Sequence, residues 1–179
     1  MEISWQEVVE TTHQYRDLHF EYWFNESLFT FRWWALFITT LVPLIVWPII
    51  VDKKRIFEIM TYGFMVTVIA VISDKIGASL LLWKYKHTLT PVSTLIEVHI
   101  IQMPLIYMII YQYFKKWKSF LIAVTINAYI FAFVLEPLLV WLQIYELYKW
   151  KTKYSFLPYI LIAVLCKSII NKLKQSSKK

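Results

Sequence analysis

Three carboxyl groups lie inside long apolar stretches of this chain: Asp74, Glu97 and Glu136. An ionisable side chain inside a bilayer costs about 2.5–3.5 kcal/mol on insertion scales, so such residues are rare and commonly serve a function. In an apolar cavity, a protonated carboxyl group can donate a proton while an ionised one accepts it. We therefore take Asp74, Glu97 and Glu136 as candidate catalytic residues.

The remaining polar residues in these stretches do not form a recognisable motif. His99 is expected to hydrogen-bond within the protein, and Asn127 to hydrogen-bond between helices. Carboxylates with histidine can bind zinc or manganese, but the chain has no HExxH motif or comparable spacing. It also has no nucleophile elbow, glycine-rich phosphate loop or kinase signature, and Cys166 is its only cysteine. We predict neither a cofactor nor a metal site.

The elements that must position these residues are membrane helices. The chain has 179 residues and is 59% hydrophobic, whereas soluble domains are roughly 45–50% apolar. A helix of about 20 apolar residues crosses the hydrocarbon layer, and the runs near that length are residues 31–51, 56–82, 92–114, 120–142 and 156–173. Tryptophans near the ends of the runs, such as Trp83 and Trp150, are typical of an interfacial aromatic belt. We predict an all-α integral membrane bundle of about five transmembrane helices.

The first 30 residues predict an amphipathic interfacial helix ahead of the bundle. Apolar residues from Trp5 to Trp23 recur at three- and four-residue spacing, and Ser4 with Glu7 forms a capping box. The polar face carries carboxylates, so the helix should pack on the bundle, on a protein partner or on the outer leaflet. The predicted division is 1–30 for this helix, 31–173 for the bundle and 174–179 for a basic tail.

Lysine and arginine predict the orientation of the bundle. The clusters at 53–55, 115–118 and 172–179 share one side of a five-span protein, and that side should be the cytoplasm. The N-terminus is then outside. The formal charge of +7 comes largely from such clusters between apolar runs, so we expect membrane lipids and not nucleic acid as partners.

The three acids fall at a similar depth, in the outer third of the predicted spans. Asp74 belongs to a stripe of small residues that suits close helix packing; the stripe consists of Gly63, Thr67, Ala70, Gly77 and Ala78. Asp74 is therefore predicted to face protein, although its neighbour Lys75 also fits a solvated helix end. Glu97 lies some 200° around its helix from His99 and could contact headgroup water.

The third acid is predicted to face inward with two residues of its own helix. Glu136 shares a helix face with Tyr129 and Ala132, at seven- and four-residue spacing. Pro137, which follows it, frees the carbonyl of Phe133 because proline has no N–H to donate.

The chain resembles an uncharacterised family of small multi-pass membrane proteins found in endospore-forming Firmicutes. The residues that carry the resemblance are Glu21-Tyr22-Trp23 with Asn25 and Trp33-Trp34, Val51-Asp52-Lys53-Lys54-Arg55, Asp74 with Gly77 and Leu82-Trp83, Tyr111-Gln112-Tyr113-Phe114 with Trp117-Lys118, Phe133-Val134-Leu135-Glu136-Pro137, and Trp150-Lys151 with Tyr154-Ser155-Phe156. The pattern departs from the family at Lys86, where proline is expected. The resemblance implies a cell-membrane location and no particular activity.

Three functions fit these observations. The first is a structural, sensing or partner subunit of the bacterial cell or spore membrane, because no catalytic motif is present and the N-terminal helix offers a docking surface. The second is a lipid- or isoprenoid-modifying enzyme with Asp74, Glu97 and Glu136 as acid and base. The third is an ion or proton conductor, which the confinement of the acids to one leaflet disfavours.

The predicted topology can be tested by cysteine labelling. With Cys166 replaced by serine, a single cysteine at position 86 should react in intact cells. One at position 116 should react only after permeabilisation, because successive loops lie on opposite sides. Equal labelling of both positions in intact cells contradicts this orientation.

Overall fold

The computed structural model describes residues 4–176 and is almost entirely helical, which confirms the all-α fold class. The elements in chain order are α1 (Trp5–Tyr22), η1 (Trp23–Ser27), α2 (Phe31–Ile50), η2 (Lys53–Arg55), α3 (Ile56–Ser79), β1 (Trp83–Tyr85), η3 (Glu97–Gln102), α4 (Met103–Tyr113), α5 (Trp117–Ile130), η4 (Phe131–Leu135), α6 (Glu136–Trp141), β2 (Tyr145–Leu147), η5 (Thr152–Tyr154) and α7 (Phe156–Ser176). The segments η1, η3 and η4 are π-helical, and η2 and η5 are 3-10 turns. Lys178 and Lys179 of the predicted tail lie outside the described residues.

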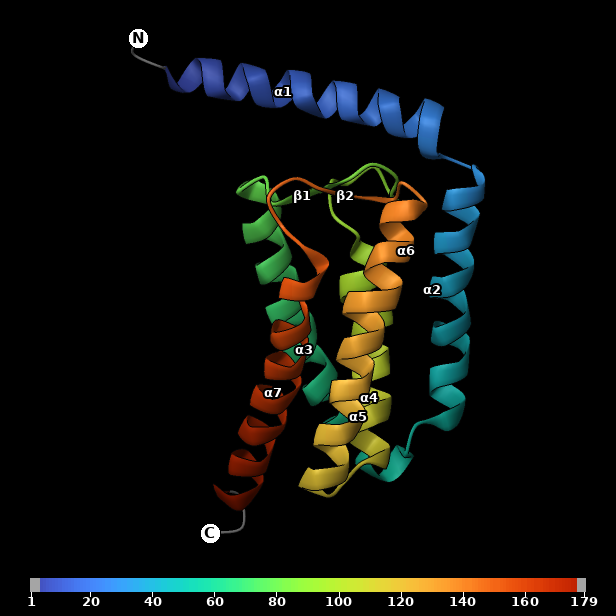
Figure 1. Ribbon diagram of the computed structural model, residues 1–179, viewed down its shortest axis with the longest axis vertical. Helices are drawn as coiled ribbons and strands as arrows, with labels where there is room; N and C mark the ends of the chain where they lie inside the picture. Colours follow the sequence, from blue (N-terminus) through green and yellow to red (C-terminus); the bar gives the residue numbers. More distant parts are fainter. Residues whose placement is uncertain (1–3, 177–179) are drawn as a thin grey trace.

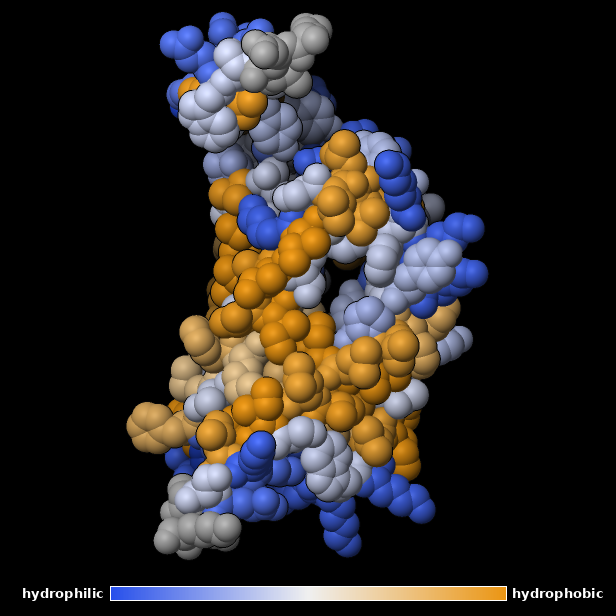
Figure 2. Space-filling view, turned by 90° about the vertical axis from the view of Figure 1, so that its left-hand side faces the viewer, coloured by the Kyte–Doolittle hydropathy of each residue, from blue (hydrophilic) through white to orange (hydrophobic). Residues whose placement is uncertain are grey.

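Helices α2, α3, α4 with η3, α5 to α6, and α7 run alternately up and down to form the bundle (Figure 1). Within residues 4–176, four segments are long and apolar enough to cross a membrane: Phe31–Ile50, Lys53–Ser79, Trp117–Trp141 and Thr152–Ser176. Figure 2 shows the matching surface, a hydrophobic band between two hydrophilic ends. These are the features of a protein inserted in a membrane.

The third predicted span, residues 92–114, is helical over a shorter length than expected. Residues 86–95 contain no regular helix, and the helix consists of η3 followed by α4. Non-helical backbone is tolerated at membrane depth where protein buries it and supplies hydrogen bonds. The indole N–H of Trp33 supplies one of them, because it donates to the carbonyl oxygen of Leu89 at 2.9 Å. We call residues 86–95 the irregular segment.

The core lies between α3, α4, α5 and α7, where Tyr62, Tyr107 and Phe120 are fully buried. The small-residue stripe of α3 faces this interior as predicted, and Thr67 is only partly buried. A Cβ atom at Gly63 would overlap the side chain of Met108. Small residues on α3 thus allow α4 to approach closely.

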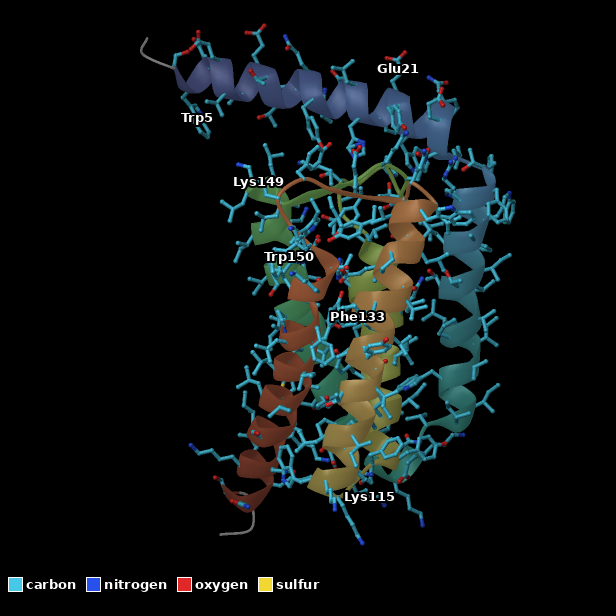
Figure 3. The ribbon with its side chains drawn as sticks, in the orientation of Figure 1. Trp5, Glu21, Lys115, Phe133, Lys149 and Trp150 are labelled. Carbon is cyan, nitrogen blue, oxygen red and sulfur yellow. The ribbon has the colours of Figure 1, made fainter. Side chains whose placement is uncertain are left out.

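The end of the bundle opposite α1 is basic, and Glu58 joins three of its helical segments through ion pairs and a hydrogen bond. Glu58 pairs with Arg55 at 2.7 Å and with Lys174 at 2.6 Å, and the Tyr111 hydroxyl donates to it at 2.6 Å. Figure 3 places Lys115 at this same end. The turn after α2, the turn after α4 and the end of α7 therefore share one side, as the lysine and arginine pattern predicts.

Helix α1 lies across the other end of the bundle and extends beyond it (Figure 1). The predicted capping box is present, with both the Ser4 side chain and the Glu7 side chain bonded to the other residue's backbone. No residue of α1 is buried. Trp5 points toward the bundle side of the helix and Glu21 away from it (Figure 3). Most of the apolar face of α1 is therefore left free for a membrane surface or a partner.

The attachment of α1 depends on the π-helical turn that follows it. The indole N–H of Trp23 donates to the carbonyl oxygen of Thr88 at 3.0 Å, and the Ser27 hydroxyl lies 2.9 Å from His87 Nδ1. Both bonds reach the irregular segment.

Replacing Trp23 with alanine should loosen α1 by about 1–2 kcal/mol, because it removes this hydrogen bond and an aromatic contact. Hydrogen exchange of residues 5–23 in detergent micelles should accelerate. Trp5→Ala is the matched control, because Trp5 is 77% exposed. Equal exchange in the two variants would show that Trp23 does not anchor the helix.

Candidate functional site

A cavity of about 370 Å³ lies in the bundle near the end that α1 covers. Its walls come from the upper turns of α3, from η3 and from α6 and α7, and strands β1 and β2 cover its top (Figure 1). Two of the three predicted site residues, Asp74 and Glu136, line this cavity together with His99. Their matched depth in separate helices is what brings them to one place.

The strands above the cavity form because two helices end in the same way. The chain leaves α3 through Leu81 at φ 54°, and the following amide bonds back to the carbonyl of Gly77 at 3.0 Å. It leaves α6 through Gln143 at φ 58°. A left-handed residue after a helix turns the chain sharply and pairs the last carbonyls. The turned segments then pair antiparallel, with Tyr85 opposite Tyr145.

Asp74 is held by three side chains from two segments, Trp83 and Tyr85 of β1 and His99 of η3. Its Oδ1 accepts hydrogen bonds from Trp83 Nε1 at 3.1 Å and from the Tyr85 hydroxyl, and His99 Nε2 lies 3.4 Å away. Asp74 is only 2% exposed, so the alternative of a solvated helix end is wrong. A Cβ atom at Gly77 would overlap the Trp83 indole, so glycine allows Trp83 to reach the acid.

Glu136 has its own set of donors on the opposite wall. Its Oε1 accepts from the Tyr159 hydroxyl at 2.6 Å and its Oε2 from the Ser155 hydroxyl at 3.1 Å. Trp150 Nε1 in turn donates to Ser155 Oγ at 2.9 Å. Figure 3 shows Trp150 beside the upper turns of α3 and α7. Both carboxyl groups are therefore supplied by tryptophan, tyrosine or serine donors.

The predicted helix face of Glu136 needs one correction. Ala132 is buried with Glu136, as predicted, but Tyr129 is 57% exposed. The π-helical turn η4 lies between Tyr129 and Glu136 and turns less per residue than an α-helix, so it rotates the two away from a common face. Pro137 favours this turn because it cannot donate the hydrogen bond of a regular helix.

Glu97 does not line the cavity. Its Oε1 accepts a hydrogen bond from the backbone N–H of Leu89 at 3.1 Å, so it holds the irregular segment. It is 2% exposed, which rules out contact with headgroup water. His99 lines the cavity whereas Glu97 contacts the irregular segment, as their angular separation on the helix predicts.

The mouth of the cavity lies between α3 and α7. The lining residues Ser73, Ile76 and Pro158 are exposed, whereas the acids are buried. Figure 2, which views the α3 and α7 side, shows a hollow at the edge of the hydrophobic band. Both helices belong to candidate membrane spans. The cavity therefore opens sideways, onto the apolar surface of the bundle.

The electrostatics of the cavity favour hydrogen bond acceptance by the acids. Burial, and after it the Asp74 carboxylate, raises the pKa of Tyr85 well above its ordinary value, and burial with Glu136 raises the pKa of Tyr145. Both phenols therefore stay protonated, and that of Tyr85 donates to Asp74. Within residues 4–176 no lysine or arginine lines the cavity, and no group of three or more potential ligands could hold a metal ion.

Sequence reasoning missed the donors around the acids. The sequence pattern predicts Trp83 and Trp150 to be interfacial anchors, and it predicts no site role for Tyr85, Ser155 or Tyr159. One signal was available, because a buried carboxyl group requires donors. The nearest indole and hydroxyl groups in the loops after α3 and α6 were the natural candidates.

The irregular segment should respond to acid through His87. Burial, and then Arg32 and Lys86, lower the pKa of His87 to about 4, so at neutral pH the ring is uncharged and its Nδ1 shares a hydrogen bond with the Ser27 hydroxyl. Unfolded histidine titrates near 6.5. The unfolded chain therefore binds more protons between pH 6.5 and 4, and stability falls as the pH falls through that window.

An NMR titration of the His87 ring in micelles should give a midpoint near 4. Thermal unfolding of the wild type should shift downward between pH 7 and pH 5, and His87→Gln should reduce that shift. A midpoint at or above the ordinary histidine value would contradict the predicted hydrogen bond.

Comparison of the chain with protein-family models, with curated proteins and with solved structures finds no match. A functional proposal therefore has to come from the geometry of the cavity.

Proposed function

We propose that this chain is a multi-pass membrane protein that binds an amphiphilic molecule in the cavity between α3 and α7. The observation that carries this proposal is the sideways mouth, which joins a mostly apolar interior holding two buried carboxyl groups to a hydrophobic surface. A ligand with an apolar tail can enter from the bilayer, and a few placed polar groups can fix its head. Binding of this kind suits a sensing subunit of the membrane.

The proposed location is the bacterial cell membrane, with α1 and the cavity on the outer side and the basic end in the cytoplasm. The resemblance to the spore-former family supports the location. The gathering of the basic segments at one end supports the orientation, because lysine and arginine favour the cytoplasmic side.

A second candidate is a lipid- or isoprenoid-modifying enzyme, and the arrangement around His99 favours it. Asp74 lies beside His99 Nε2, while His99 Nδ1 is buried with no partner among residues 4–176. An imidazole oriented by a carboxylate is a common general base, and a second carboxyl group, here Glu136, can act as the acid. Glu97 has no part in this candidate because it holds the irregular segment.

The proposal predicts that the mouth and the acids control lipid retention. In native mass spectrometry of protein released from lipid nanodiscs, Ile76→Trp should remove most retained lipid because the indole blocks the mouth. Ile72→Trp is the matched control, since Ile72 and Ile76 are 55% and 57% exposed on the same helix and only Ile76 lines the cavity. Asp74→Asn and Glu136→Gln should each weaken retention, and the double variant should be no worse than either.

Several outcomes separate the candidates. Equal retention by the Ile76 and Ile72 variants would overturn the proposed binding. Additive, mild losses in the carboxyl variants would show that the two acids do not act as one site. A change in mass of the retained lipid that requires His99 would identify the protein as the enzyme of the second candidate.

A further inference from the structure

We infer that the cavity selects an amphiphile whose head group is an organic cation, an aliphatic amine or a quaternary ammonium group. This inference rests on the proposed function, because it names the class of ligand for the same cavity. Three independent features of the lining lead to it: its charge, its aromatic rings and an unpaired carboxylate oxygen.

The first feature is the charge of the lining. It contains two carboxyl groups, Asp74 and Glu136, and among the described residues no lysine or arginine. A phosphate or sulfate head group would meet these acids, and like charges placed together are repulsive. A cation instead favours the ionised form of both carboxyl groups. The lining therefore selects against anionic heads.

The second feature is the aromatic wall. The ring centres of Trp83 and Trp150 are 5.3 Å apart at an angle of 70°, and Tyr145 lies 6.4 Å from Trp83 at 61°. Tyr85 stacks on Tyr145 at 5.5 Å. All four residues line the cavity. The rings of Trp150 and Tyr145 are both steeply inclined to that of Trp83, and aromatic rings that border one cavity in this way can bind an ammonium group through cation–π attraction.

The third feature is the second oxygen of Asp74. Oδ1 has three polar neighbours, but Oδ2 is buried with no hydrogen bond partner among residues 4–176. Buried polar atoms normally have a partner, and an exception asks for an explanation. The head of the ligand, placed beside Trp83, would lie next to Asp74 because Trp83 already bonds to that acid. An amine head would donate a hydrogen bond to Oδ2, and a quaternary ammonium head would supply a positive charge beside it.

The position of the mouth accounts for the rest of the ligand. Ile76 and Pro158 at the mouth are apolar and exposed, while the acids lie deeper. The tail can remain between α3 and α7 in the bilayer while the head occupies the cavity. A water-soluble cation without a tail would leave this apolar rim unused.

The test is calorimetric titration of the full chain in maltoside micelles with decyltrimethylammonium, decylammonium, decanol and decyl sulfate. The two cations should bind about tenfold more tightly than decanol, which is the size of a moderate cation–π contribution. Decyl sulfate should bind more weakly than decanol. Asp74→Asn and Trp83→Leu should each weaken binding of the cations and leave that of decanol nearly unchanged.

The outcomes separate this inference from the proposed function. If all four probes bind alike and Ile76→Trp weakens them all relative to Ile72→Trp, the amphiphile site stands and the preference for cations is overturned. If Ile76→Trp weakens none of them, both are overturned. Trp83→Leu provides the comparison with decanol even where Asp74→Asn fails to fold.

Discussion

Two carboxyl groups buried in an apolar bundle are the constraint from which the upper half of this protein follows. Taking an ionised carboxylate out of water is unfavourable unless it is paired or hydrogen-bonded. Asp74 and Glu136 are 2% and 7% exposed. Their donors cannot come from helix backbone, whose N–H groups are already bonded within the helix. They come from side chains: Trp83, Tyr85 and Ser155 lie in the strand and loops above the bundle, and Tyr159 lies in α7.

The pairing of strands β1 and β2 places these side chains beside the acids. Strand β1 carries the two donors of Asp74, Trp83 and Tyr85, directly after the helix that carries the acid. The donors of Glu136 follow β2, at Ser155 and Tyr159. Pairing of the strands holds these loops together over the cavity. The left-handed residues that lead into the strands cost conformational energy, which the hydrogen bonds at the helix ends and in the ladder offset.

A third buried acid, Glu97, is subject to the same constraint and bonds to the backbone of the fold. Glu97 bonds to the backbone of the irregular segment, and Trp23 and Trp33 bond to carbonyls of that segment. These bonds let residues 86–95 remain non-helical within the bundle. The segment in turn holds α1, so a carboxyl group inside the bundle influences a helix on its surface.

The sequence by itself determined the class of the protein and the depth of its acids. Long apolar runs predict membrane helices because a helix satisfies the hydrogen bonds of its own backbone in lipid. The stripe of small residues on α3 predicts that Asp74 faces the interior of the bundle, and Asp74 is buried there. Helical spacing also predicts that Glu97 and His99 lie on different faces of their helix, and only His99 lines the cavity. Each of these properties depends on the spacing of residues along a single helix, and that spacing can be read from the sequence.

Only the tertiary structure decided which groups meet. The π-helical turn before Glu136 changed its face relative to Tyr129, because a single extra residue in a turn leaves no trace in average periodicity. Strands β1 and β2 are about sixty residues apart in the chain, and two three-residue strands carry too weak a local pattern to be predicted. The donors of the acids, and with them the cavity, depend on this long-range pairing. Spacing within one segment cannot encode a contact between two segments whose separation is set by the packing of whole helices.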